Sequence, residues 1–148
     1  MKVPVVRFIV EDGAKLPHYA THGASGADVY AYLPEGSVTL PPLGGRALIP
    51  TGLTIELPQG YEAQVRPRSG LAAKHGISVV NSPGTIDWDY RGVLTIILIN
   101  YSEQEFVVRH TDRIAQLVIS PVVQAEFEEA QQLSETQRGE RGFGSTGV

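Results

Sequence analysis

The chain contains no cysteine. This absence excludes disulfide bonds, cysteine-ligated zinc sites and thiol nucleophiles together, and it is compatible with a reducing compartment. His18 and His22 are four residues apart, but Thr21 and Gly23 flank His22, so no helix there supports a zinc site. The residues that stand out for chemistry are instead carboxylates, arginines and hydroxyls.

Long apolar runs and an excess of basic charge are also missing. Pro4 and Arg7 interrupt the apolar start, which does not resemble a secretion signal, and the longest apolar run, residues 93–99, is far below the roughly 20 residues of a membrane span. The net charge of −4 argues against broad binding to nucleic acid or anionic membranes, whose charge attracts Lys and Arg. A small anionic substrate is still compatible. We therefore expect a cytoplasmic protein with no nucleic-acid or membrane partner.

Short apolar segments with period-two alternation dominate the sequence, and its 16 glycines and 10 prolines supply the turns between them. Many short strands at close spacing predict an all-β sandwich or barrel, and the length of 148 residues suits one domain, residues 1–148. Strands are expected at residues 3–10, 37–40, 53–57, 61–66, 77–80, 93–99, 106–108 and 114–119.

One short helix is expected at residues 69–75, with Ser69 as its N-cap and Gly76 as its stop. After Pro121 the sequence becomes polar and acidic, and it then has the pattern of an extended tail. We therefore divide the domain into a core, about residues 1–124, and a C-terminal arm, about residues 125–148.

The start of the expected helix is a candidate anion site. Free N–H groups, the Ser69 hydroxyl and the Arg68 guanidinium converge there, and all three favour an anion. Taken alone, these two residues are more often a capped helix beside a solvated arginine.

Carboxylates mark two further candidates. Asp87, Asp89 and Tyr90 lie in a turn-rich stretch between apolar strands, and an extended chain would put both aspartates on the side opposite Tyr90. An aspartate over a pocket can act as a general base, although aspartate is also ordinary in hairpin turns. Asp28, expected in a loop between glycines and a strand, could orient a hydrated Mg²⁺.

The last glycine-rich segment, residues 142–147, fits the G-x-G-x-x-G pattern, but that pattern needs a following helix and only Val148 follows. Glycines let a backbone approach a ligand closely, and Phe143 can cover a planar base. Arg138, Ser145 and Thr146 can hold phosphates. The alternative is an ordinary disordered end.

Taken together, five stretches in this order resemble the five motifs of the homotrimeric dUTPases. The resemblance spans Ser25 to Gly147, and no Walker A lysine pattern suggests a P-loop alternative. The stretches are A-S-G-A-D-V-Y-A (24–31), R-P-R-S-G-L-A (66–72), N-S-P-G-T-I-D-W-D-Y-R-G (81–92), D-R-I-A-Q-L-V-I (112–119) and R-G-E-R-G-F-G-S-T-G (138–147).

This resemblance implies a jelly-roll-like β-barrel that forms a homotrimer with shared active sites. One subunit would supply the first, second and fourth motifs, a neighbour the third, and the remaining subunit the arm, which would be a mobile lid. The implied reaction converts dUTP and water to dUMP and pyrophosphate, which limits uracil incorporation into DNA and supplies dUMP for thymidylate synthesis.

The resemblance also implies the catalytic roles. Asp87 would activate a water that attacks the α-phosphorus, and Gln116 would hold the phosphate or the water network. Arg138 would reach the γ-phosphate from the arm. Mg²⁺, bound mainly by the triphosphate and held through water by Asp28, would spread the developing charge.

Substrate binding is assigned in the same way to three groups of residues. Phosphate oxygens would be bound by Arg68, Ser69, Gly70, Ser145 and Thr146. The uracil would be read by the hairpin at Asn81, Gly84, Thr85 and Ile86 and covered by Phe143 and Gly144. Tyr90 would pack under the sugar, where a ribose 2′-hydroxyl would clash.

One position departs from the family pattern, and two rival functions remain. The family usually has glycine where this chain has Arg141, which could add a phosphate contact or stiffen the lid; Arg138 keeps the family spacing to Phe143. A dCTP deaminase shares the barrel and the trimer, and ammonia release from dCTP would reveal it. A non-catalytic nucleotide-binding module would bind nucleotide without turnover.

Overall fold

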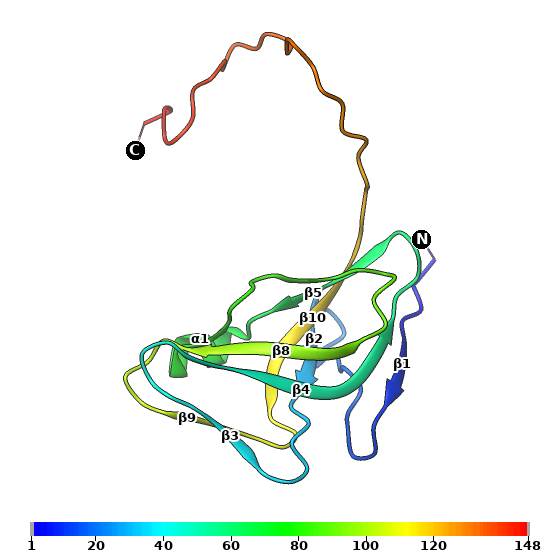
Figure 1. Ribbon diagram of the computed structural model, residues 1–148, viewed down its shortest axis with the longest axis vertical. Helices are drawn as coiled ribbons and strands as arrows, with labels where there is room; N and C mark the ends of the chain where they lie inside the picture. Colours follow the sequence, from blue (N-terminus) through cyan, green and yellow to red (C-terminus); the bar gives the residue numbers. More distant parts are fainter. Residues whose placement is uncertain (1, 148) are drawn as a thin grey trace.

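The computed structural model describes residues 2–147; Met1 and Val148, the ends of the predicted domain and arm, lie outside the described residues. Strands dominate the chain, and one short helix joins two of them (Figure 1). The elements are β1 (Arg7–Val10), β2 (Ala27–Tyr30), β3 (Ser37–Leu40), β4 (Gly45–Glu56), β5 (Tyr61–Arg66), α1 (Ser69–His75), β6 (Ile77–Val79), β7 (Gly84–Ile86), β8 (Val93–Asn100), β9 (Phe106–Arg109) and β10 (Arg113–Pro121).

The described strands form three antiparallel sheets, in the orders β1-β4-β8-β6, β2-β10-β5-β7 and β3-β9. Alternation along the strands explains their packing, as in β8, where Leu94, Ile96 and Leu98 are buried between more exposed neighbours. These inward residues meet those of β4, β5 and β10 in one apolar core. The expected jelly-roll-like, all-β barrel is confirmed.

Several sequence-based boundaries were wrong. The first strand begins only at Arg7, and β4 begins at Gly45, because an apolar face continues through Pro50 despite the proline. Strand β7 was not predicted, and the strand expected after Asp28 was given no bounds. Both strands are short and lie beside turns, which conceal a strand in a local pattern. Asp28 therefore lies in strand β2 and not in a loop.

Helix α1 has the predicted bounds, and Gly76 ends it in the left-handed conformation at φ 66°. The predicted N-cap was wrong, because Arg68 is the extended residue before the helix and makes no side-chain capping bond. Ser69 is the first helical residue.

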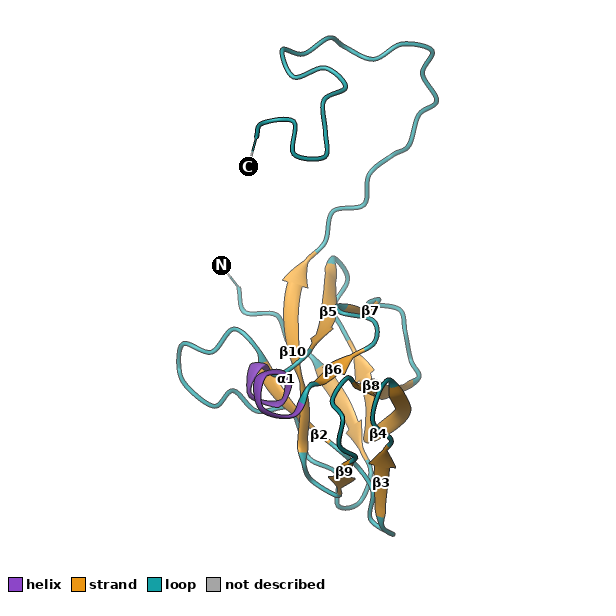
Figure 2. Cartoon of the chain, turned by 90° about the vertical axis from the view of Figure 1, so that its left-hand side faces the viewer, coloured by secondary structure: helices purple, strands orange, loops and turns teal. Residues whose placement is uncertain are grey.

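Beyond β10 the chain leaves the barrel as a long arm, which extends away from the sheets in two perpendicular views (Figures 1 and 2). Val122 N still donates to Gly60 O at 2.9 Å, and residues 122–141 are all exposed. The division into one core and one arm near residue 125 stays a prediction. None of the helices in residues 2–147 is long and apolar enough to cross a bilayer.

Candidate functional site

One polar cluster lies where strands β2, β10 and β5 run side by side. Gln116 on β10 pairs with Asp28 on β2 and with Arg66 on β5, so antiparallel pairing carries Asp28 and Gln116 to one face of the sheet. Arg68 follows two residues after Arg66, at the entry to α1. Its Nε donates to Asp28 Oδ1 at 3.1 Å, which ties the second motif to the first.

Asp28 is held between two guanidinium groups. Arg113 Nη1 lies 3.5 Å from Asp28 Oδ2, and the Asp28 side chain is only 13% exposed. A carboxylate this shielded from water needs charged partners, and the two arginines supply them. Arg68 Nη1 also donates to the Arg113 carbonyl at 3.2 Å. Nε and Nη1 of Arg68 are therefore occupied by these bonds, and Nη2 is the guanidinium nitrogen that can bind an anion. Asp28 thus orients the arginine expected to bind phosphate.

Gln116 is fixed by a hydrogen bond and by a missing side chain. Its Nε2 donates to the Pro67 carbonyl at 2.9 Å. On the other side lies Gly26, where an added Cβ would overlap Gln116 Oε1 and come within 2.9 Å of Gln116 Cδ. Position 26 therefore requires glycine, because any side chain there would displace the amide of Gln116. The amide lies between Gly26 and the turn that carries Arg68.

For the dUTP hydrolysis that the resemblance implies, Gly26→Ala is expected to lower kcat about 10- to 100-fold. The added methyl group displaces Gln116, and a displacement of about 1 Å at a reacting centre can cost about 100-fold in rate. Gly23→Ala is the matched control in the same loop, since nothing lies within 4 Å of its added Cβ. Steady-state kinetics of both variants check the expectation. Equal activity in the two would show that the Gln116 position does not matter.

A second cluster surrounds the β7 hairpin. Asn81, Gly84, Thr85 and Ile86 line a pocket of about 210 Å³ that extends to β8, smaller than the roughly 300–1,000 Å³ of sites for drug-sized ligands. An added Cβ at Gly84 would lie 3.1 Å from Asn81 Nδ2 and 3.2 Å from Val65 Cβ. Gly84 is thus packed against Asn81 and Val65, and the small volume of the pocket suits one ring of a ligand.

Asp87 and Tyr90 stand at the mouth of this pocket. Tyr90 N donates to the Asp87 carbonyl at 3.1 Å, so residues 87–90 form a turn, and the extended alternation considered from the sequence was wrong. Tyr90 Oη donates to the Val93 carbonyl at 3.0 Å. The tyrosine ring lies against Gly92, where an added Cβ would be 2.8 Å from Cε2. These contacts hold the ring at the pocket, while Asp87 is exposed to solvent.

The two clusters are separated within one chain. Gly84 pairs with Val65, Val65 with Leu117, and Leu117 with Ala27, so three strand spacings, about 14 Å, lie between β7 and β2. From this row the chain runs in opposite directions to Asp87 and to Arg68. One chain therefore does not bring Asp87 beside Asp28, Arg68 and Gln116.

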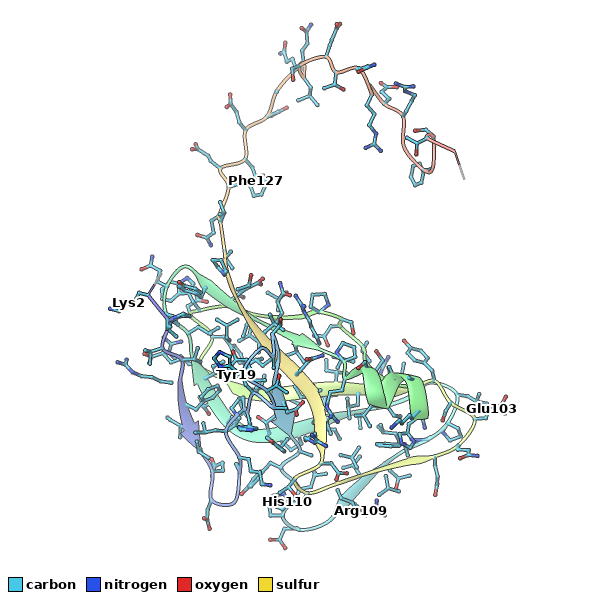
Figure 3. All side chains as sticks on the ribbon, turned by 180° about the vertical axis from the view of Figure 1, so that it is seen from behind. Lys2, Tyr19, Glu103, Arg109, His110 and Phe127 are labelled. Carbon is cyan, nitrogen blue, oxygen red and sulfur yellow. The ribbon has the colours of Figure 1, made fainter. Side chains whose placement is uncertain are left out.

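The candidate residues of the arm are not brought to either cluster. Phe143 is fully exposed at φ 51°, and Gly144, Ser145 and Thr146 follow in an exposed turn. Arg138 Nε donates to the Arg141 carbonyl at 2.8 Å, within the arm itself. Farther back, Phe127 projects from the arm at 95% exposure (Figure 3). Within residues 2–147, the apolar and cationic side chains of the arm are thus exposed and do not pack against the barrel of the same chain.

Sequence reasoning missed three residues that shape these clusters. Arg113 belongs to the quoted D-R-I-A-Q-L stretch, but its pairing with Asp28 depends on the β2–β10 register. Gly26 and Gly92 also lie in the quoted stretches, and their role is to leave room for Gln116 and Tyr90. Glycines beside functional residues were the available signal.

Comparison with known proteins identifies the family of this chain. A family model described as dUTPase matches residues 12–147. The deoxyuridine 5'-triphosphate nucleotidohydrolase of Roseobacter denitrificans is 61% identical over 132 residues, which cover 89% of this chain and 86% of that protein. The Chlamydia caviae protein of the same name is 59% identical over 141 residues, which cover 93% of this chain and 95% of that protein. The solved dUTPase of Staphylococcus bacteriophage 80alpha with dUPNHPP superposes with a TM-score of 0.86 at 26% identity, covering 97% and 99%. With its barrel, its two polar clusters and its arm, this chain belongs to the dUTPase family.

Proposed function

We propose that this chain is a dUTP diphosphatase, which hydrolyses dUTP to dUMP and pyrophosphate. The observation that carries the proposal is the small β7 pocket lined in part by Asp87, in a chain that is 61% identical to a deoxyuridine 5'-triphosphate nucleotidohydrolase. The reaction would limit uracil incorporation into DNA and supply dUMP for thymidylate synthesis.

The geometry of the pocket supports recognition of the nucleoside. Uracil would enter the hairpin at Asn81 and residues 84–86, where backbone groups and the Asn81 amide offer a complementary polar edge. The small volume of the pocket would leave little space for a 5-methyl group. Tyr90 would lie under the sugar and exclude a 2′-hydroxyl. Steric exclusion and unpaired buried polar groups discriminate strongly between similar substrates.

Asp87 would act as the general base. Its exposed carboxylate at the pocket mouth would accept a proton from a water molecule as that water forms a bond to the α-phosphorus. The bond between the α-phosphorus and the bridging oxygen to the β-phosphate breaks, and pyrophosphate leaves. Gln116, Arg68, Ser69 and Gly70 would hold the phosphate oxygens, with Arg68 oriented by Asp28.

The donor set fits a Mg²⁺ ion that arrives with the triphosphate. Among residues 2–147, no group of three or more His, Asp or Glu side chains could hold a metal ion, and Mg²⁺ commonly binds through one or two carboxylates, substrate phosphates and water. Because both Asp28 oxygens face guanidinium groups, Asp28 would hold the hydrated ion through water. When bound, the ion offsets the negative charge of the phosphoryl oxygens.

We infer a homotrimer with active sites shared between subunits. The separation of about 14 Å between β7 and β2 keeps Asp87 away from the phosphate cluster of its own chain. A neighbouring subunit can present its β7 hairpin to that cluster, and the exposed arm of the remaining subunit can close over both with Arg138 and Phe143. Cyclic homo-oligomers provide such repeated contacts.

Pyrophosphate release with Mg²⁺ from dUTP, dTTP, dCTP and UTP, measured side by side, tests the proposal. Rapid release from dUTP alone is expected. Equal release from all four would contradict the selective pocket, ammonia release from dCTP would indicate a deaminase, and tight binding of dUTP without turnover would indicate a binding module.

A further inference from the structure

The arm contains a turn in which two arginine side chains each donate a hydrogen bond to the backbone carbonyl of the other. Arg138 Nε donates to the Arg141 carbonyl at 2.8 Å, and Arg141 Nε donates to the Arg138 carbonyl at 2.9 Å. Arg141 Nη2 also donates to the Gln137 carbonyl at 2.7 Å. A third side chain supports the turn, because Gly139 N donates to Thr136 Oγ1 at 3.1 Å. We call this reciprocal pair the arginine clasp.

The two guanidinium groups are used differently. Arg141 directs Nε and Nη2 to two backbone carbonyls, so most of its planar fork is occupied within the turn. Within the turn Arg138 donates only through Nε, so its two terminal nitrogens, Nη1 and Nη2, can donate to another acceptor. Two terminal nitrogens of one guanidinium match two phosphate oxygens. The clasp therefore leaves both terminal nitrogens of Arg138 for another acceptor, whereas it uses two of the three nitrogens of Arg141.

We propose that Arg141 is a positioning residue that acts through Arg138. By bonding the carbonyls of residues 137 and 138 it holds the arm in the turn that aims Arg138 at the triphosphate, and it makes no phosphate contact itself. This inference rests on the proposed function. Of the two roles considered for Arg141 from the sequence, a phosphate contact and a stiffened lid, it assigns the stiffened lid.

The physical basis is preorganisation. The turn is exposed, and no hydrogen bond or ion pair within residues 2–147 joins it to the barrel, so its shape depends on its own hydrogen bonds. Ordering a rotamer-rich segment costs free energy, and an arm that is already folded avoids part of that cost. Because Arg138 is proposed to act on the charge of the transition state, this cost falls on kcat more than on KM. Exposed hydrogen bonds contribute modestly, so loss of the two Arg141 bonds should lower kcat about fivefold.

A double-mutant cycle of Arg138→Ala, Arg141→Ala and the double variant tests the inference, with dUTP hydrolysis as readout. Arg141→Ala should lower kcat about fivefold with KM nearly unchanged, and it should add nothing in the Arg138→Ala background, because it acts through the missing side chain. The kcat of Arg141→Lys should be about as low as that of Arg141→Ala, because the lysine ammonium lacks the planar arrangement of donors that a guanidinium has. Glu140→Gln, in the same turn, is the control expected to match the unmodified enzyme.

A readout without substrate separates this inference from the proposed function. Amide ¹⁵N relaxation of Gly139 and Gly142 in the free enzyme should give order parameters that drop below about 0.6 in Arg141→Ala. Multiplicative losses in the cycle, near-normal kcat in Arg141→Lys, or unchanged order parameters would each overturn the inference. An enzyme that hydrolyses no dUTP would overturn the proposed function, while the relaxation data would still decide whether Arg141 orders the turn.

Discussion

Asp87→Asn is expected to lower kcat for dUTP about a thousandfold, within the 10²–10⁴-fold range of general base catalysis. The amide has the shape of the carboxylate but cannot accept the proton of the attacking water. The KM should change little, because the amide keeps the shape of the carboxylate, and Asn81, Gly84, Thr85, Ile86 and Tyr90, which line the same pocket, are unchanged. Steady-state pyrophosphate release at saturating dUTP measures the loss.

Asp89→Asn is the matched control, because Asp89 lies in the same turn and is also exposed but is not among the residues that line the hairpin pocket. It should keep kcat within a few-fold of the unmodified enzyme. Both exposed substitutions should leave the free energy of unfolding within about 0.5 kcal/mol. If Asp87→Asn kept more than a tenth of the activity, Asp87 would not be the base.

Deletion of the arm after Gln132 is expected to lower kcat/KM for dUTP about a thousandfold or more. The deletion removes Arg138, whose proposed role resembles that of the arginine fingers worth about 10³–10⁵ in kcat. It also removes Phe143, and stacking of an aromatic ring on a base contributes about 1–3 kcal/mol. The midpoint of thermal unfolding should be unchanged, because residues 133–141 are exposed and the core lies in the barrel.

Mixing this truncated chain with the Asp87→Asn chain tests whether the sites are shared. If Asp87 and the arm reach a site from different subunits, a 1:1 mixture that is unfolded and refolded together should complete about a quarter of its sites (one half times one half). If one chain supplied both, no site in the mixture would be complete and activity would stay at the level of the separate variants. Single Arg138→Ala and Phe143→Ala variants then divide the loss between phosphate and base contacts.

The sequence by itself determined the fold class and most of the elements. Alternation in residues 61–66 predicted a strand because one face of it is buried, and the β-branched apolar run of residues 93–99 predicted another. Gly76 predicted the end of α1 because glycine adopts a positive φ without strain. The five stretches also predicted which residues to consider for the site, since their spacing along the chain is a local property.

Only the tertiary structure decided how those residues meet. The register of β10 against β2 places Arg113 beside Asp28, and the close approach of Gly26 to Gln116 depends on atoms ninety residues apart along the chain. The strand order β2-β10-β5-β7 separates Asp87 from Arg68, although the two residues are only 19 positions apart in the sequence. Period-two patterns report which face of a strand is buried but not which strand lies next to it, because pairing is set by the whole packed core.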